Sequence, residues 1–344
     1  MAYGALYASR SYIVTAPVYS GMGIILAFHR VCPHSGKKRL AGNSRSEVTP
    51  EYLEEAIKFF SRHDYKAISP DELARILKEG WSDKKFVVFT FDDGYADNFT
   101  YAYPVFKKYG IPFTIYVATG FPDKTAVLWW SVLEDAIIEN DDVVIRLGGR
   151  AYKYACREWR EKESAFDSIR TLVINRGAGG GRDQLEDIFA GYIKDSREKA
   201  DGPALEWGQI ESLSRDNLVT IGAHTVNHGV LKNIPDDAAR YEIGQSKKRI
   251  EDHIGRPVEH FSYPFGSPDM ISRRDIRMVR ELGFKTAVTS MAGNIFPGHG
   301  KYIYCLPRAT ISGDRDARNP EYLNLWTGGV IGCVKNMFRK VVYG

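Results

Sequence analysis

The chain has 344 residues, a formal net charge of +4 at pH 7 and 44% hydrophobic residues. A chain of this length can bury a sizeable core without a disulfide or a structural metal, and the slight excess of basic residues excludes a dedicated nucleic-acid binder. The cysteines are far apart and form no C-x-x-C pair, so we expect reduced thiols at Cys32, Cys156, Cys305 and Cys333.

The targeting signals are weak. No run of about 20 apolar residues predicts an ordinary transmembrane helix. Arg10 precedes a modestly apolar stretch, but Thr15 and Pro17 interrupt it before a signal-peptide core can form. We therefore expect the protein to act in the cytoplasm, including at the inner-membrane surface, with a periplasmic or extracellular location as the alternative.

Apolar runs alternate with helix signals along the chain. Thr49-Pro50 and the capping box at 69–72 begin predicted helices, and Gly80 and Gly110 end them. A later helix is predicted from Ser267 to near Gly283. The other predicted helices span 98–109 and 237–254, and the predicted strands span 23–28, 86–91, 111–118, 218–223, 258–263 and 284–289.

This order predicts an α/β fold. Repeated β-α units place the carboxyl ends of parallel strands at one edge, and the candidate reactive groups all follow strands, so we favour a parallel α/β barrel. Residues 123–205 break the rhythm with a tryptophan pair, a predicted hairpin near Gly148-Gly149 and charged helices. We predict an N-terminal extension at 1–21, a barrel at 22–315, an inserted helical lid at 123–205 and a C-terminal amphipathic tail at 316–344.

Two strings carry the candidate chemistry. Thr90-Phe91-Asp92-Asp93-Gly94 and His224-Thr225-Val226-Asn227-His228 each follow an apolar strand. Two imidazoles and one carboxylate can bind a divalent metal while leaving positions open, so we expect His224, His228 and Asp93 as ligands. Asp92 would point elsewhere and act as the general base that takes a proton from water.

Each string alone has an ordinary explanation. Asp-Asp-Gly after a strand is often only a turn, and H-x-x-x-H occurs by chance. Their occurrence together, both after strands of an alternating β/α chain, favours a metal-dependent hydrolase.

The two strings resemble the polysaccharide deacetylases with a nodulation-protein-B homology domain, carbohydrate esterase family four. The resemblance covers residues 22–312, with the insert matching less well. It implies a distorted (β/α) barrel, commonly seven-stranded, that removes N-acetyl groups from hexosamines with Zn²⁺, or with Co²⁺, Ni²⁺ or Fe²⁺. It also implies Asp92 as base and Asp93, His224 and His228 as ligands, and we expect Thr225 to support those ligands from behind.

A third string departs from the common family pattern. Phe261-Ser262-Tyr263-Pro264-Phe265-Gly266 lacks the arginine that usually opens this motif, and it resembles the exopolysaccharide branch with F-x-Y-P-[YF]-G. By analogy, the Phe265 amide would help to stabilise the oxyanion, and Tyr263, Pro264 and Gly266 would shape that edge of the site. A rigid Pro-Gly strand exit explains the same string and is compatible with this role.

The family's L-x-x-H histidine, a general acid, is missing. Leu306-Pro307-Arg308 stands in its place, so His29 at a strand end is the first candidate acid and His299 the second. A hydrogen-bonded His29 with no proton to deliver remains the alternative. Arg308 either orients Asp92 or pairs with a surface acid.

Aromatic residues and the tail leave two further questions open. Trp129 and Trp130 either stack on sugar rings or belong to a core. The tail from 322 to 343 has apolar residues near helical spacing, with basic residues between them. It either docks on the barrel or lies on a membrane surface, and its glycines weaken the helix prediction.

The combined evidence predicts a metal-dependent N-deacetylase. Its partner would be an N-acetylated glycan of a bacterial surface polysaccharide or a lipid- or nucleotide-linked precursor. An O-acetyl esterase and a spent glycan-binding module are the alternatives. A non-haem iron oxygenase also uses two histidines and a carboxylate, but the extra acid favours hydrolysis.

Overall fold

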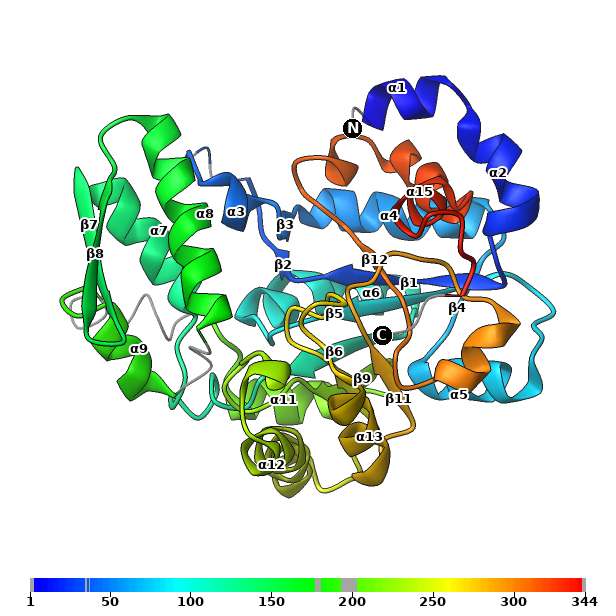
Figure 1. Cartoon of the computed structure of the whole chain (residues 1–344). Helices are drawn as coiled ribbons and strands as arrows, with labels where there is room; N and C mark the ends of the chain where they lie inside the picture. Colours follow the sequence, from blue (N-terminus) through cyan, green and yellow to red (C-terminus); the bar gives the residue numbers. More distant parts are fainter. Residues whose placement is uncertain (1–2, 35, 37, 177–180, 193–202, 342–344) are drawn as a thin grey trace.

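A curled parallel sheet forms the centre of the protein (Figure 1). The computed structural model describes residues 3–34, 36, 38–176, 181–192 and 203–341. Seven strands pair in the order β11-β10-β9-β6-β5-β1-β12, all in parallel, and the short β4 (Lys66–Ala67) also pairs with β5. The seven are β1 (Gly23–Phe28), β5 (Phe86–Phe91), β6 (Phe113–Val117), β9 (Val219–Ala223), β10 (His260–Ser262), β11 (Thr286–Val288) and β12 (Ala309–Thr310).

One segment touches both edges of this sheet. Leu306 forms a parallel bridge with Val288 at the end of β11, and Ala309 of β12 pairs with Leu26 of β1. The segment at 306–310 therefore links the last strand back to the first. The prediction of a distorted, seven-stranded (β/α) barrel is confirmed.

Strand alternation decides which side chains enter the barrel. In β5, Val87, Phe89 and Phe91 pack outward against the helices, whereas Phe86 and Val88 belong to a separate inner cluster. Because successive side chains point to opposite faces, Thr90 and Asp92 continue the inner row. By the same alternation, three more side chains point toward the interior: His29 after β1, His224 after β9 and Ser262 in β10.

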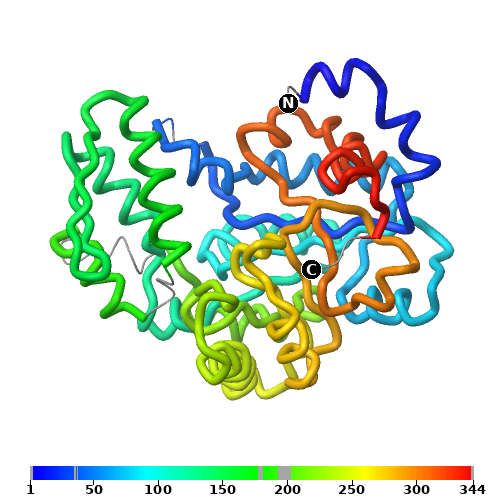
Figure 2. Tube along the Cα trace, viewed as in Figure 1, coloured from blue at the N-terminus to red at the C-terminus, as the bar shows by residue number. Residues whose placement is uncertain are grey.

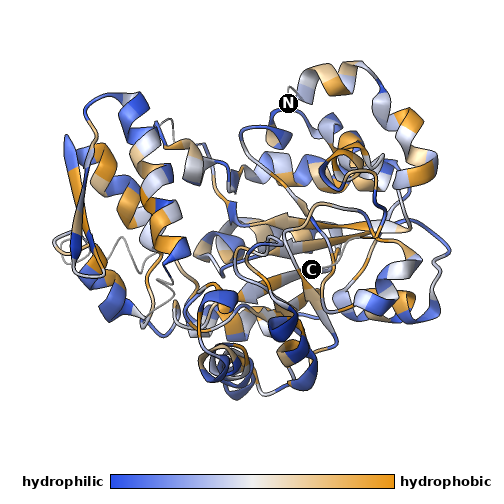
Figure 3. Cartoon of the chain, in the orientation of Figure 1, coloured by the Kyte–Doolittle hydropathy of each residue, from blue (hydrophilic) through white to orange (hydrophobic). Residues whose placement is uncertain are grey.

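Most helices cover the outer face of the sheet, whereas the helix at 70–79 packs on the inner cluster through Leu73, Ile76 and Leu77. The helix ends follow the predicted signals. The Thr49 and Ser69 side chains each accept a hydrogen bond from the first turn of their helices, and Gly80 and Gly110 end helices in the left-handed conformation. The barrel helices are α4 (Pro50–Arg62), α5 (Pro70–Glu79), α6 (Tyr103–Tyr109), α11 (Trp207–Ser214), α12 (Asp236–Ile254) and α13 (Arg273–Glu281). Figure 3 shows hydrophilic residues on the outer surfaces of α12 and α13.

Two helix predictions need correction. The helix expected from Ser267 begins only at Arg273, because the Ser272 side chain and Asp275 form a capping box there. The helix expected over 98–109 begins as a π-helical turn, η1 (Asn98–Ala102), before α6. The short remaining elements are β2 (Arg30–Val31), α3 (Ala41–Ser44), β3 (Glu47–Val48), η3 (Leu231–Asn233), η4 (Pro297–Tyr302), η5 (Asp316–Arg318) and η6 (Pro320–Tyr322).

The insert has a hydrophobic core of its own. Most of that core comes from residues 127–189, which pack apart from the barrel clusters. The predicted hairpin is present, and Gly148 and Gly149 both have positive φ at its turn. Residues 177–180 and 193–202 of the predicted insert lie outside the described part. Its described elements are α7 (Trp129–Glu139), β7 (Asp142–Leu147), β8 (Arg150–Ala155), α8 (Trp159–Asn175) and α9 (Arg182–Ile188).

A buried carboxylate ties the insert to the segment after β2. Glu134 of α7 is 2% exposed and accepts both arms of Arg39, at 2.9 and 2.6 Å, together with the Leu40 amide and the Asn43 amide group. Arg39 also pairs with Glu47. These contacts place Arg39 and Asn43 beside the barrel mouth, where they line a cavity between the barrel and the insert.

The N-terminal and C-terminal helices of the described chain pack against each other (Figure 2). The expected tail helix is interrupted at Gly328-Gly329, and two short helices replace it, α14 (Leu323–Thr327) and α15 (Val330–Lys335). Leu325 and Trp326 of α14 join the barrel core, so this part of the tail docks on the protein. The N-terminal helices α1 (Tyr3–Ala8) and α2 (Ser11–Tyr19) contact the tail. Within the described chain, no helix is both long enough and apolar enough to cross a membrane.

We predict that Glu134→Gln lowers the free energy of unfolding by about 2 kcal/mol, because Arg39 and the Leu40 amide lose a buried charged acceptor. Chemical denaturation of the variant and of Glu139→Gln, an exposed position on the same helix, measures the difference. Equal stability of the two variants would show that Glu134 does not fasten the insert.

Candidate active site at the barrel rim

Asp92 and Arg308 form a buried ion pair inside the barrel. The Arg308 guanidinium donates to both Asp92 oxygens, at 2.8 and 2.6 Å, and both residues are at most 4% exposed. Arg308 also donates to Thr90 Oγ1, Ser262 Oγ and the Thr289 carbonyl. Burial opposes ionisation of Asp92, but the charge and hydrogen bonds of Arg308, together with the nearby histidines, outweigh burial and lower the pKa of that carboxyl. Of the two roles left open for Arg308, the geometry favours holding Asp92.

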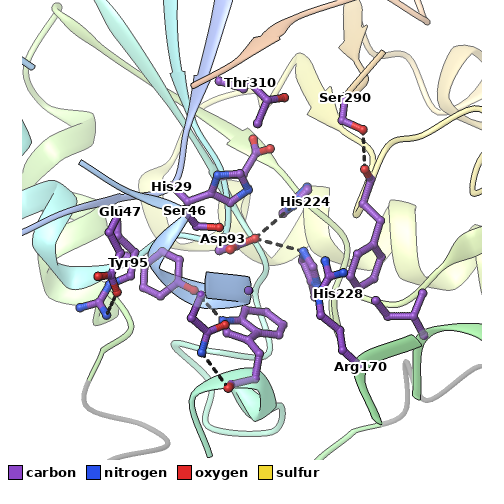
Figure 4. Close-up of a pocket in the computed structure, with 18 of the residues that line it drawn as sticks. His29, Ser46, Glu47, Asp93, Tyr95, Arg170, His224, His228, Ser290 and Thr310 are labelled. Atoms are coloured by element: carbon purple, nitrogen blue, oxygen red, sulfur yellow. Dashed lines mark hydrogen bonds and ion pairs between the residues drawn. The ribbon is translucent and has the colours of Figure 1, made fainter. Parts of the chain in front are cut away.

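Asp93 turns away from its neighbour and faces the two histidines. Its Oδ1 atom lies 3.4 Å from His224 Nε2 and 3.0 Å from His228 Nε2, although it has no hydrogen-bond partner of acceptable geometry (Figure 4). Burial raises the pKa of Asp93, and the two imidazoles outweigh it and bring it well below its usual range. The His224 Nδ1 atom lies 2.7 Å from the Ser262 carbonyl, which leaves Nε2 facing Asp93.

Several residues at the barrel rim have strained backbone conformations. Asp93 has φ 73°, Thr225 φ 67°, His228 φ 56° and Phe265 φ 61°, so four of the nine described non-glycine residues with positive φ lie at this rim. Such conformations cost on the order of 1–3 kcal/mol each and persist where the surroundings enforce them. The positive φ of Asp93 explains how adjacent carboxylates reach separate partners.

The side chains of Asp93, His224 and His228 fit a metal ion. Their donor atoms lie within 4.8 Å of one another, and all three residues are buried. Ligands about 2.1 Å from a tetrahedral ion are roughly 3.4 Å apart, close to the 3.0 and 3.4 Å separations of this set. A buried carboxylate oxygen without a hydrogen bond is costly unless a cation accepts its charge. The donor set of two nitrogens and one oxygen suits Zn²⁺ and similar ions.

Glu242 holds the histidine loop in place. This buried carboxylate of α12 accepts the amides of Val226 and Asn227, at 2.9 and 2.8 Å, and the Asn227 side-chain amide at 2.7 Å. Burial raises the pKa of Glu242, and these hydrogen bonds partly oppose the rise. Thr225 Oγ1 accepts the His228 amide at 3.1 Å, so Thr225 supports a candidate ligand from behind.

His29 joins the same rim from the end of β1. Its Nδ1 atom is buried without a hydrogen-bond partner among the described residues, and its ring lies near Asp93 in Figure 4. The Asn98 side chain donates to the His29 carbonyl at 2.8 Å, and Asp97 accepts the Val31 amide at 3.1 Å. These two hydrogen bonds hold the backbone in place at His29 and at Val31.

The rim opens into a cavity of about 400 Å³ between the barrel and the insert. His29, Asp92, Asp93, His224 and His228 all line it. The insert contributes Trp130, Ser131, Arg170 and Ile174, and the strand-exit loops contribute Tyr263, Phe265, Ser267 and Met270. The insert is therefore one wall of the candidate site.

The third string forms a tight turn at the edge of this cavity. The Gly266 amide donates to the Pro264 carbonyl at 2.7 Å, and a Cβ atom at Gly266 would lie 2.6 Å from the Ser290 nitrogen. Glycine is required here, since the position also has φ 61°. The centres of the Phe265 and His228 rings lie 4.9 Å apart. Tyr263 is buried and donates its hydroxyl to the Tyr304 carbonyl, so it supports the turn from inside.

Trp129 and Trp130 have different surroundings: Trp129 belongs to the core of the insert, and Trp130 lines the cavity. Trp129 is 4% exposed, stacks on Phe189 in the insert core and does not line the cavity, so its assignment to the substrate site is corrected. Trp130 does line the cavity. Its indole NH donates to the Tyr95 hydroxyl at 2.7 Å, and its ring lies 5.2 Å from the His228 ring.

His299 is excluded from the rim. It lies in η4, which packs on α5 and not on the strand ends, and it does not line the cavity. Its Nδ1 atom accepts the Phe296 amide at 3.0 Å. Burial lowers its pKa to about 4, which suits a neutral structural histidine and not an acid for the reaction.

Sequence reasoning missed several residues around the site. Glu242 lies on the inner face of a predicted amphipathic helix, where a carboxylate among Ala239, Ile243 and Ile250 was the available signal. Tyr95, Asp97 and Asn98 follow the Asp-Asp-Gly string, but no spacing rule marks them.

Comparison with known proteins identifies the class. The family model of polysaccharide deacetylases matches residues 79–287, more than half of the chain, and the chain belongs to this family. Similar solved structures include the Streptococcus pyogenes deacetylase PplD in complex with acetate, with a TM-score of 0.59 at 19% identity over 88% of this chain and 97% of that one. IcaB from Ammonifex degensii gives a TM-score of 0.55 at 17% identity, over 89% and 97% of the two chains. At these identities the likeness shows the fold alone.

Curated relatives match over a short segment. YxkH of Bacillus subtilis (strain 168) is 38% identical over 78 residues, which are 22% of this chain and 28% of that protein. The poly-beta-1,6-N-acetyl-D-glucosamine N-deacetylase of Staphylococcus aureus (strain N315) is 36% identical over 73 residues, 21% of this chain and 25% of that protein. The matched segment is thus about a quarter of each relative's length.

The lowered pKa of His299 predicts a pH-dependent stability. Between about pH 6.5 and pH 4, His299 binds a proton in the unfolded chain but stays neutral in the folded chain. The contribution of His299 to the free energy of unfolding is therefore fully present above pH 6.5, and it decreases as the pH falls toward 4. We expect His299→Asn, which keeps an acceptor for the Phe296 amide, to remove up to about 3 kcal/mol of this decline. Denaturation curves at several pH values measure it. An unchanged slope in the variant would refute the assignment.

Proposed function

We propose that this protein is a metal-dependent N-deacetylase of N-acetylhexosamine units in a bacterial surface polysaccharide or its lipid- or nucleotide-linked precursor. The observation that carries the proposal is the separation of the adjacent acids: Arg308 holds Asp92 beside, but apart from, the Asp93-His224-His228 set. Membership of the polysaccharide deacetylase family supports it. The matched N-deacetylase of Staphylococcus aureus favours an exopolysaccharide-type substrate, as does the F-x-Y-P-F-G string.

Asp93, His224 and His228 would hold the ion, most simply Zn²⁺. When bound, it would polarise the acetyl carbonyl and make water more acidic. Asp92 is kept ionised by Arg308, so it is ready to accept a proton from the attacking water. The two-pronged contact with Arg308 also fixes the direction of the carboxylate, which matters because a general base must reach the proton it removes.

Two further groups complete the reaction. Phe265 lines the cavity, and its amide would donate a hydrogen bond to the oxyanion that forms when water adds to the carbonyl, a contribution of about 3 kcal/mol in well-studied hydrolases. His29 would then give a proton to the departing amine as the C–N bond breaks and acetate leaves. Its unpartnered Nδ1 atom at the rim supports this role.

A second candidate is an O-acetyl esterase that uses the same site. Arg308 stands where the family's L-x-x-H motif places its acid, and an alkoxide leaving group needs protonation less than an amine does. Acetate release from N-acetylglucosamine oligomers compared with acetylated xylan separates the two. Release from neither substrate, with the metal bound, would favour a glycan-binding module.

We predict that Asp92→Asn keeps its metal and loses at least about 10²-fold in kcat, because the neutral amide cannot accept the proton from water. Metal analysis of the purified protein and acetate release measure the two properties together. Near wild-type turnover in a metal-bearing variant would remove Asp92 from the base role.

We also predict that His29→Asn lowers amide hydrolysis by about 10²-fold while ester hydrolysis falls less than about tenfold, since the amine leaving group depends more on the acid. His34→Asn, at an exposed position nearby in sequence, is the control. Equal losses on amide and ester substrates would mean that His29 does not act as the acid.

A further inference from the structure

Exposed apolar side chains concentrate on two segments near the chain ends. Of the nine large hydrophobic residues described as exposed, six lie on α2 or at the end of α15. Val14, Met337 and Phe338 are exposed by 79%, 76% and 71%. Scattered exposed hydrophobic residues are ordinary, whereas gathered ones mark an interaction surface. We call this set the terminal patch: Ile13, Val14, Val18, Val334, Met337 and Phe338.

The two parts of the terminal patch are joined. The helices α2 and α15 pack against each other, as Figure 1 also shows. The Tyr19 hydroxyl donates to the Phe338 carbonyl at 3.3 Å, and Thr15 Oγ1 donates to the Gly328 carbonyl at 2.7 Å. Segments more than 300 residues apart in sequence therefore form one continuous surface.

The conformation after α15 presents two of these side chains. Met337 and Phe338 both have positive φ, 47° and 66°, and the Phe338 amide donates back to the Cys333 carbonyl at 2.8 Å. This turn leaves both side chains in solvent, although the chain there is anchored. The turn caps the end of α15, because the Phe338 and Met337 amides donate to the Cys333 and Val334 carbonyls, and it leaves two hydrophobic side chains exposed.

The two segments that build the patch carry charge of one sign, although Glu321 directly precedes the second segment and the buried Asp316 lies within electrostatic reach of Lys335. Residues 1–20 and 322–344 contain four of the 47 basic residues and none of the 43 acidic ones. The rest of the chain therefore has no net charge, and the entire +4 belongs to the segments that build the patch. The four basic residues are all exposed: Arg10, Lys335, Arg339 and Lys340.

We propose that the terminal patch docks on an anionic lipid surface. Apolar side chains flanked in sequence by exposed basic ones match an interface that is apolar below and negative at its surface. Aromatic rings near the patch suit the headgroup level: Tyr7 stacks on Tyr12, and Lys340 Nζ lies 6.0 Å from the centre of the Tyr19 ring. A second copy of the chain fits less well, because its own patch would bring like charges together.

This surface is independent of the proposed catalysis. The helix α2 leads into the start of β1, whereas His29 follows its end, so the patch and the rim lie at opposite ends of that strand. In Figure 1 the insert and α2 lie on opposite sides of the molecule. Docking through the patch would leave the rim away from the lipid, accessible to a glycan that extends from the surface.

Flotation of the full-length protein with phosphatidylcholine vesicles, with and without phosphatidylglycerol, tests the proposal. We expect binding only to the anionic vesicles. The variant Val14→Ser/Phe338→Ser should bind at least about tenfold more weakly, since it loses buried apolar surface. The variant Arg339→Gln/Lys340→Gln should lose about fivefold per charge and show a weaker salt dependence.

Matched variants at other exposed positions are the controls. Trp81→Ser/Tyr241→Ser removes hydrophobic residues elsewhere, and Lys78→Gln/Lys248→Gln removes distant charges, so both should bind like the wild type. Acetate release from a soluble substrate should be unchanged in the patch variants, which separates docking from catalysis. Absence of wild-type binding, equal binding to neutral vesicles, or a stable dimer that the Val14→Ser/Phe338→Ser variant dissociates would overturn the proposal.

Discussion

Two adjacent carboxylates are buried at the rim, and each needs its own partner. Burying two negative charges side by side is costly unless each is compensated, so Asp92 and Asp93 together constrain the surrounding structure. Strand alternation sends Asp92 inward, where Arg308 meets it with two hydrogen bonds. The left-handed conformation of Asp93 turns the next carboxylate toward His224 and His228. The same chain thus provides a base and a ligand from consecutive positions.

This constraint explains features that lie far away in sequence. The segment at 306–310 connects the last barrel strand to the first, and it also delivers Arg308 into the interior. Glu242 on α12 fixes the loop that carries the histidines, and the Asp97-Asn98 pair fixes the chain at His29. The insert closes one wall of the cavity and is fastened through Glu134.

The sequence predicted the barrel well because its signals are local. Continuous apolar runs gave β1 and β5 with their observed bounds, and capping residues marked α4 and α5. The prediction of α13 was wrong at its start, since the cap at Ser272 is followed by charged residues and not by an apolar run. Contacts between distant residues were harder to foresee. The sequence left open whether Arg308 pairs with Asp92 or with a surface acid. No local pattern separates a core position of Trp129 from a position in the substrate site. A single carboxylate on the inner face of a helix likewise does not reveal that Glu242 holds the histidine loop.

We propose that Asp93, His224 and His228 hold one cation. X-ray absorption at the zinc edge of the Zn²⁺-loaded protein, combined with a binding titration, measures the ligands and the stoichiometry of this site. We expect one ion per chain, with two imidazole nitrogens among its ligands and binding lost in His228→Ala. A stoichiometric site that survives His228→Ala unchanged, or no stoichiometric binding at all, would contradict it.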